Sequence, residues 1–343
     1  MSRRPATLLV AAAGVLIATI VAAVAPVPYV ALTPGPTLNT LGTLSGKPLI
    51  QVKGHPVYPA PGNLNMVTVS FLGGPGTGFN IFGALRAWLT ADNAVVPASE
   101  IFTPGQTSQQ VAREDTEEMA NSQETATAAA LCQLKINFRT VDTVQATVKG
   151  MPAAGVLHRG DVIVAVNGEP VTCRADAATL IKERKPGAPV PLTVARHGKT
   201  GQVRLKTADV QGQPEIGVQI VESFVFPFDV TISVGDIGGP SAGLMFALGI
   251  IDKITPANLT GGKFIAGTGE IEANGTVDPI GGIQQKMAGA RAAGATIFLT
   301  PAANCPDAAR AVPAGLRLIK VESLAGAIAD LDALKAGRPV PSC

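Results

Sequence analysis

The segment Gly239-Pro240-Ser241-Ala242-Gly243 constrains this chain more than any other. A Gly-Gly-Pro turn that leads into an apolar run predicts a helix from about Ser241 to Ile254. Helix N-termini leave backbone N–H groups unpaired, and such groups stabilise negative charge that develops on a nearby oxygen. Serine is also a favoured helix cap, and for the segment taken alone this structural role is the better interpretation.

A lysine 45 residues further along the chain changes that interpretation. Lys286 follows Gly281-Gly282 on an apolar-patterned helix that we expect over residues 283–293. A lysine that faces an apolar interior loses stability of its charged form, so its pKa falls toward the ~7–8 that suits a base. A neutral amine of this kind activates a serine hydroxyl without any histidine. The alternative is a surface lysine on an amphipathic helix.

Four short runs follow one another in this region: GPSAG at 239–243, TGEI at 268–271, PIGG followed by a lysine at 279–286, and an Ala-rich helix. Together they resemble the proteolytic domain of the Lon protease family, which uses a Ser-Lys dyad. The resemblance implies Ser241 as nucleophile, Lys286 as general base and Thr268 as the residue that orients the lysine amine. It also implies an oxyanion-hole turn formed by Gly239, Pro240 and Ala242.

Two neighbouring positions need separate interpretation. Glu270 is predicted to be a structural or rim residue, because a carboxylate beside the lysine would keep the amine charged. In many Lon members an acidic residue stands three positions before the serine. Here that position is Gly238, and the nearest acid is Asp236. This difference changes the expected shape and charge of the site but leaves the dyad in place.

The stretch 144–207 has a different character. Gly160-Asp161-Val162-Ile163 and Asn167-Gly168 place turns at both ends of an apolar strand, and a hairpin is expected at 197–199. These residues resemble a bacterial PDZ domain, which binds an extended chain as an extra strand at a sheet edge. A helix at 175–184 would flank the groove. The usual carboxylate-binding loop is not recognisable, so the groove residues stay unassigned, and a spacer or lid is the alternative role.

The N-terminus contains a stretch without charges, from Thr7 to Ala25, preceded by Arg3-Arg4. Its 19 residues approach the ~20 that a membrane-spanning helix needs. Arginines on the cytoplasmic side would place the rest of the chain outside the cell membrane, as a single-pass protein with a cytoplasmic N-terminus. A cleaved signal peptide is the alternative, because Ala23-Val24-Ala25 is typical of a cleavage site, although Pro26 would obstruct cleavage.

The four cysteines fit an exported protein, because none forms a C-x-x-C metal or redox motif. We expect Cys305 to pair with Cys343 and Cys132 with Cys173. Four buried or free thiols are the alternative, since four cysteines permit three pairings.

The remaining pattern predicts an α+β fold in which strands and helices alternate after residue 215. A strand is expected at 64–71, then a helix at 79–89 with Trp88 in the core, then a longer helix from Thr107 or Ser108 to about Leu131. In the Lon family an Ala-rich helix comes before the strand that leads into GPSAG. Here the matching helix, at 118–131, lies before the PDZ segment, so we expect the PDZ segment to be inserted into, or to precede, the protease domain. The expected divisions are an anchor at 1–30, an irregular juxtamembrane segment at 31–61, the first protease part at 62–131, the PDZ domain at 132–208 and the Lon-type domain at 209–343.

Several functional classes are disfavoured. The net charge is +2 with 15% charged residues and 4% aromatics, which gives no electrostatic footprint for nucleic acid. No His/Cys/Asp cluster has metal-ligand spacing, so no metal or other cofactor is expected. The three histidines, His55, His158 and His197, lie outside the serine motifs, which disfavours a His-based triad. The Walker-like fragment Gly198-Lys199-Thr200 has Thr193 where a P-loop needs its first glycine.

The sequence therefore predicts a membrane-anchored, ATP-independent serine endopeptidase that hydrolyses extracytoplasmic polypeptides, with a PDZ domain that selects or gates them. Its partners would be polypeptide substrates and, through residues 7–25, the lipid bilayer. The family resemblance adds a possible hexameric ring. Two other functions remain: a catalytically silent PDZ adaptor that binds partner termini, and a small-molecule kinase of the GHMP type, whose phosphate loop the GGPSAG segment resembles.

Overall fold

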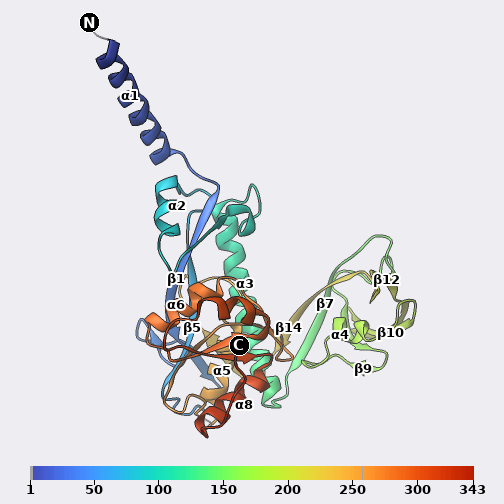
Figure 1. Cartoon of the computed structure of the whole chain (residues 1–343). Coiled ribbons are helices and arrows are strands. Elements are labelled where there is room, and N and C mark those ends of the chain that lie inside the picture. The colour runs from blue at the N-terminus through green and yellow to red at the C-terminus, as the bar shows by residue number, and fades with distance from the viewer. Residues whose placement is uncertain (1–2, 257) are drawn as a thin grey trace.

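The computed structural model describes residues 3–256 and 258–343. Figure 1 shows a projecting N-terminal helix, α1 (Arg3–Val24), a larger lobe beneath it and a smaller lobe at the side. Helices and strands are mixed in both lobes, so the α+β prediction is confirmed.

A six-stranded sheet forms the centre of the larger lobe, in the order β20-β19-β16-β5-β1-β6. Its strands are β1 (Tyr29–Asn39), β5 (Asn63–Leu72), β6 (Ala94–Pro97), β16 (Phe264–Gly267), β19 (Ile297–Pro301) and β20 (Arg317–Val321). β16 runs parallel to β5 and β19, whereas β1 is antiparallel to β5 and β6. Strands from before and after the smaller lobe therefore share one sheet.

Alternating side chains on these strands face two separate apolar cores, as the two-residue period of a strand requires. On one face Ile265 and Leu299 pack with the helices α3 (Ser108–Gln133), α5 (Gly243–Ile254) and α8 (Leu324–Lys335). On the other face Ala266 and Phe298 pack against α6 (Ile283–Ala292). Consequently α5 and α6 cover opposite faces of the sheet.

The long helix α3 begins where the sequence predicts. Thr107 is its N-cap, and a capping box joins Thr107 and Gln110, so two otherwise unpaired N–H groups are satisfied. Only its second half is buried, where small residues let α3 approach α5 closely. α3 thereby reaches the segment that carries Ser241.

The smaller lobe has its own sheet, in the order β11-β10-β8-β7-β14 with β9 attached to β8, and its own apolar core. Its elements are β7 (Arg139–Thr147), β8 (Val162–Val166), β9 (Glu169–Pro170), α4 (Ala177–Lys182), β10 (Pro189–Arg196), β11 (Lys199–Lys206) and β14 (Val218–Val225). The expected turns around β8 and the expected hairpin between β10 and β11 are present.

Short strands connect these units. The pairs are β2 (Thr43–Leu44) with β3 (Lys47–Pro48), β4 (Ile50–Lys53) with β15 (Asp229–Ile232), β12 (Ala208–Val210) with β13 (Gln213–Glu215), and β17 (Glu270–Ile271) with β18 (Val277–Asp278). The remaining helices are α2 (Ile81–Trp88), α7 (Cys305–Ala308) and single 3-10 turns at Ala98–Glu100, Ala302–Asn304 and Ala309–Ala311.

Three expectations differ from the structure. Residues 29–39 form β1 between β5 and β6 of the sheet, so the prediction of an irregular segment at 31–61 is wrong there. Prolines and glycines obscure the strand, and its register against β5 shifts between Pro34 and Thr37. Trp88 is 69% exposed and lies outside the core. The alternation predicted after residue 215 begins in the smaller lobe and not in the larger one, because β14 pairs with β7 in the smaller lobe's sheet.

Both expected cysteine pairs are disulfides. Cys132, in the last turn of α3, is bonded to Cys173 in the smaller lobe, and Cys305 is bonded to Cys343. The first bond ties the two lobes together, and the second fixes the C-terminus to α7.

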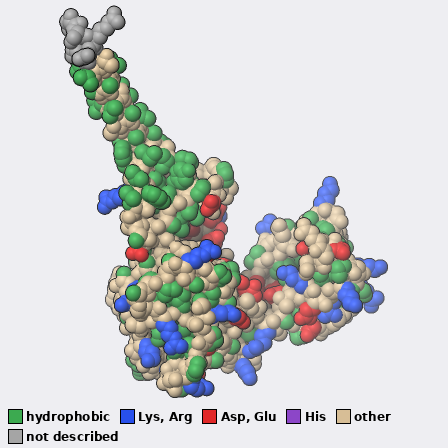
Figure 2. All heavy atoms as spheres, in the orientation of Figure 1, with side chains coloured by type: hydrophobic (Ala, Val, Ile, Leu, Met, Phe, Trp, Pro, Cys, Tyr) green, Lys and Arg blue, Asp and Glu red, His purple; other side chains and the backbone are tan. Residues whose placement is uncertain are grey.

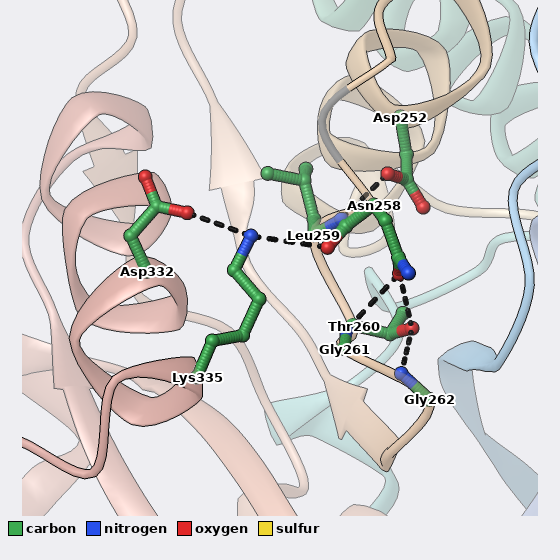
Figure 3. Close-up of polar contacts among 8 residues, drawn as sticks. All are labelled: Asp252, Asn258, Leu259, Thr260, Gly261, Gly262, Asp332 and Lys335. Carbon is green, nitrogen blue, oxygen red and sulfur yellow. Dashed lines mark hydrogen bonds and ion pairs between the residues drawn. The ribbon is translucent and has the colours of Figure 1, made fainter.

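The connection from α5 to β16 is held by polar contacts (Figure 3). The Asp252 carboxylate accepts a hydrogen bond of 2.6 Å from the Leu259 N–H. Lys335 of α8 donates to the Asn258 carbonyl oxygen at 3.1 Å and pairs with Asp332 at 2.8 Å. These contacts matter for function because β16 leads directly to Thr268.

We expect Asp252→Ala to lower the free energy of unfolding by about 1–3 kcal/mol, because the buried Leu259 N–H would lose its acceptor. Urea denaturation followed by circular dichroism measures the change. Asp332→Ala is the matched control, since its ion pair with Lys335 is solvent-exposed and should contribute less than about 1 kcal/mol. Equal effects of the two substitutions would contradict this account.

Candidate active site

The turn that carries Ser241 lies two residues before α5 and is held by α3. Gly239 has φ of 86°, in the left-handed region that favours glycine, and its N–H donates to the Asp115 carbonyl oxygen at 3.0 Å. The Ser122 hydroxyl donates to the Pro240 carbonyl oxygen at 2.9 Å. Because both partners belong to α3, this helix fixes the backbone on which Ser241 stands.

Steric contact with α3 explains why position 238 is a glycine. A Cβ atom added there would lie 2.4 Å from the Cβ of Asp115, so a larger residue does not fit against α3. Asp115 instead lines the groove beside Ser241. Sequence reasoning missed Asp115 and Ser122 because both precede the PDZ segment and carry no motif.

Lys286 reaches Ser241 from the opposite face of the sheet. Gly282, with φ of 66°, ends the preceding loop close to Val69, and α6 then places Lys286 in its first turn. The lysine Nζ lies 2.6 Å from the Ser241 Oγ. The side chain is only 4% exposed, and this burial lowers the pKa of Lys286 to about 7. A large fraction of the amine is therefore neutral at physiological pH.

Thr268 joins the two residues. It is fully buried just beyond the end of β16, and its Oγ1 lies 3.0 Å from the Lys286 Nζ. The same hydroxyl donates to the Ser241 carbonyl oxygen at 2.9 Å, and the Gly269 N–H donates to that oxygen as well. Because its proton is used in this way, Thr268 accepts an N–H from the lysine. The lone pair of a neutral amine is then left for the Ser241 hydroxyl.

Unpaired N–H groups also lie at the serine. Within residues 3–256 and 258–343, the backbone N–H groups of Ser241 and Ala242 donate no hydrogen bond to another residue. The Gly239 N–H is used by Asp115, and proline has no N–H, so Gly239 and Pro240 shape the turn. Ser241 and Ala242 are consequently the backbone donors available to an oxyanion.

A groove of about 740 Å³ runs past Ser241 and Lys286. One wall is the part of β5 from 66 to 71. Residues 67 to 71 of this wall lie beyond Met66, which is the last residue of β5 that pairs with β16. The opposite wall belongs to α3, where burial and the charge of neighbouring carboxylates raise the pKa values of Asp115 and Glu118. The groove thus has an acidic rim.

Glu270 lies on β17 and does not line the groove. Its pKa is raised by burial and by the neighbouring carboxylates Asp278 and Glu118. No group of three or more His, Cys, Asp or Glu side chains in the described part of the chain is arranged to hold a metal ion.

Comparison with known families identifies two domains. Residues 131–207 match the PDZ domain family, and residues 229–330 match the Lon protease (S16) C-terminal proteolytic domain. The chain therefore contains a PDZ domain followed by a Lon-type proteolytic domain. The second match includes Ser241, Thr268 and Lys286.

Individual relatives agree with this identification. The chain is 44% identical over 69 residues to Lon protease of Roseiflexus castenholzii, and the match covers 20% of this chain and 8% of that protein. It is 40% identical over 79 residues to Lon protease 2 of Thermus thermophilus, and 31% over 120 residues to Lon protease 1 of Bacillus subtilis. The Thermus match covers 23% of this chain and 10% of that protein, and the Bacillus match covers 32% of this chain and 15% of that protein. The chain thus spans only a small part of the length of these relatives.

Two solved structures each match a part of the chain. The PDZ domain of the SdrC-like protein from Listeria innocua is 27% identical, with a TM-score of 0.21, and the match covers 23% of this chain and 92% of that one. The corresponding domain from Listeria monocytogenes is 28% identical, with the same TM-score, and the match covers 23% and 86%.

Proposed function

We propose that this protein is an ATP-independent serine endopeptidase in which Ser241 is the nucleophile and Lys286 is the general base. The observation that carries the proposal is the contact of a buried lysine amine with both the Ser241 and the Thr268 hydroxyls, at 2.6 and 3.0 Å. A surface lysine would make neither contact and would keep its ordinary pKa, so the structural alternative for Lys286 is disfavoured.

In this mechanism Lys286 takes the Ser241 hydroxyl proton while the serine oxygen attacks the peptide carbonyl carbon. The N–H groups of Ser241 and Ala242 stabilise the resulting oxyanion. The lysine ammonium then gives its proton to the leaving amine, and an acyl-enzyme remains. Water, deprotonated by the same lysine, hydrolyses the ester and restores the serine. Thr268 keeps the amine aligned throughout.

The groove favours a polypeptide in an extended conformation. Among residues 3–256 and 258–343, no strand pairs with β5 beyond Met66 on the side of β16, and this edge lines the groove next to Ser241. An extended segment placed there would pair with β5 as an added strand. Folded proteins lack free segments of this kind, so we expect unfolded chains and flexible termini to be cleaved.

The PDZ domain is proposed to select these chains. β14 is the edge strand of its sheet and follows Gly217, which has φ of 70°, while α4 packs against β13. A peptide would bind along β14 between this strand and α4. The end of the edge is already occupied, because the Phe224 N–H donates to Glu124 of α3 at 3.1 Å. The free part of the edge is therefore 218–223.

Independence from ATP is supported by the position of the Walker-like fragment. Gly198-Lys199-Thr200 forms the turn and the start of β11 in the PDZ hairpin, whereas a P-loop must lead from a strand into a helix N-terminus. The kinase alternative rests on the GGPSAG segment instead, where the contact of the buried Lys286 amine with the Ser241 hydroxyl at 2.6 Å favours a peptidase.

We further propose that α1 anchors the enzyme in the cell membrane, with the catalytic part outside the cytoplasm. By length and composition α1 is a helix that can cross a membrane, and a signal sequence satisfies the same criteria. The two disulfides favour an oxidising compartment. A ring of six subunits is proposed from the Lon resemblance.

The proposal is tested by incubating the purified full chain in detergent with unfolded casein, with and without ATP. We expect cleavage at the same rate in both samples. Absence of cleavage under conditions that preserve any oligomer would favour the alternative of a catalytically silent PDZ adaptor. Cleavage that requires ATP would contradict the proposed independence from nucleotide.

A further inference from the structure

Helix α2 presents an exposed apolar face to its surroundings. Its sequence, Ile-Phe-Gly-Ala-Leu-Arg-Ala-Trp, contains one basic residue, Arg86, and no acidic residue. The exposed large side chains on α2 and at its C-cap are Ile81, Phe82, Leu85, Trp88 and Leu89, with Trp88 at 69% and Leu89 at 71%. Scattered exposed hydrophobic residues are normal, but a helix with this many marks an interaction surface.

The position of α2 identifies the partner. The Asn80 side chain, which caps α2, donates to the Ala23 carbonyl oxygen of α1 at 2.6 Å, and the Val27 N–H donates to the Phe79 carbonyl oxygen at 2.8 Å. α2 is therefore attached to the end of the candidate membrane span. In Figure 2 the hydrophobic surface continues from α1 over the adjacent part of the larger lobe, where Figure 1 places α2.

The mouth of the catalytic groove lies on the same side of the lobe. Phe71 and Leu72 at the end of β5 are about half exposed, and Ile101 is also exposed. Phe71 and Ile101 line the groove. β5 pairs along its length with β1, whose first residue, Tyr29, follows α1 closely in the chain. The end of β5 and the groove mouth consequently face the level of the membrane.

We propose that α2 and the tip of β5 lie in the interface of the bilayer that α1 spans, so that the groove opens at the membrane surface and receives polypeptides tethered to that membrane. This inference rests on the proposed anchor and on the proposed peptidase activity. The chemistry of α2 suits a lipid interface, where tryptophan is enriched and a single arginine extends toward the headgroups. Attachment of α2 to α1 brings its apolar face to that interface.

Trp88 permits a direct test because it is the only tryptophan of the chain. The full chain is reconstituted into lipid nanodiscs of phosphatidylcholine and phosphatidylglycerol, and the Trp88 fluorescence is measured with brominated lipids and with iodide. Contact with lipid predicts quenching by the brominated lipids and protection from iodide. Quenching by iodide alone would overturn the inference. Protection from both quenchers, which would mean burial against a second copy of the chain, would overturn it as well.

The consequence for substrates is tested with Phe82→Glu combined with Leu85→Glu. Both side chains are exposed and neither lines the groove, so the fold and the catalytic groups are unaffected. We expect Trp88 to become accessible to iodide and cleavage of a membrane-anchored casein segment to fall at least fivefold, while cleavage of soluble casein is unchanged. Val312→Glu, an exposed apolar position elsewhere, is the matched control and should change neither rate.

The outcomes separate the two proposals. If soluble casein is not cleaved by the wild type, the peptidase proposal fails, whereas the Trp88 measurement still decides the membrane contact. If both casein substrates are cleaved equally by the double variant and the wild type, the inferred preference for tethered substrates is wrong.

Discussion

Ser241→Ala and Lys286→Met are each expected to lower kcat/KM for casein by at least about 10³-fold while the protein stays folded. Alanine removes the oxygen that attacks the carbonyl carbon, and methionine removes the amine that contacts that oxygen at 2.6 Å. Initial rates of cleavage measure the effect, and circular dichroism reports the fold. The double variant should be no slower than either single variant, because the two residues act as one unit.

Two further substitutions sharpen this test. Lys286→Arg retains a basic side chain, but a guanidinium stays protonated and cannot act as a base, so it should be as inactive as Lys286→Met. Thr268→Val removes the hydroxyl that lies 3.0 Å from the amine and should lower kcat more than it raises KM. Substantial activity in Ser241→Ala would contradict the assignment and indicate another nucleophile.

The motifs around the serine and the lysine predict local structure well because turns and helix starts depend on a few neighbouring residues. The start of a helix at 283 and the hairpin at 197–199 follow from such short-range signals. The same signals do not show that α5 and α6 cover opposite faces of one sheet. Lys286 approaches Ser241 because α5 and α6 lie on these opposite faces. The family resemblance predicts this approach, whereas hydrophobic periodicity does not.

Sequence reasoning misses contacts between residues that lie far apart in the chain. Ser122 and Asp115 hold the serine turn from α3, and the PDZ segment separates them from it in the chain. β1 is hidden because its prolines and glycines are typical of a loop, yet its neighbours in the sheet stabilise an extended conformation. Trp88 fits an amphipathic pattern, and such a pattern does not say whether protein or lipid covers the apolar face.

The second large effect concerns pH. Only neutral Lys286 accepts a proton, so kcat/KM should increase with pH and level off above the lysine pKa of about 7. At pH 5, two units below that pKa, the rate should be about 100-fold below the plateau. An acid limb near pH 4, typical of a carboxylate base, would contradict the assignment of Lys286, as would a rate that increases until pH 10.

The same burial predicts a pH-dependent stability. In the unfolded chain the lysine has its ordinary pKa of 10.5, whereas in the folded protein the pKa is about 7. Between these values the unfolded state binds more protons, so this group makes stability increase with pH across that window and decrease as the pH falls toward 7. Glu222 has the opposite effect on stability. Burial and nearby carboxylates raise its pKa from 4.5 to about 8, so between these values its contribution to stability decreases as the pH increases.

The difference in free energy of unfolding between wild type and Lys286→Met isolates the contribution of Lys286 from that of groups such as Glu222. At pH 7.5 the variant should be more stable than the wild type by a few kcal/mol, since methionine is not charged in the unfolded chain and has no desolvation cost. The advantage should shrink steadily as the pH approaches 10.5. Urea midpoints measured at several pH values test this relation. A variant that is inactive yet more stable at neutral pH would show that the buried lysine is retained for chemistry, whereas a variant less stable at every pH would indicate a structural role.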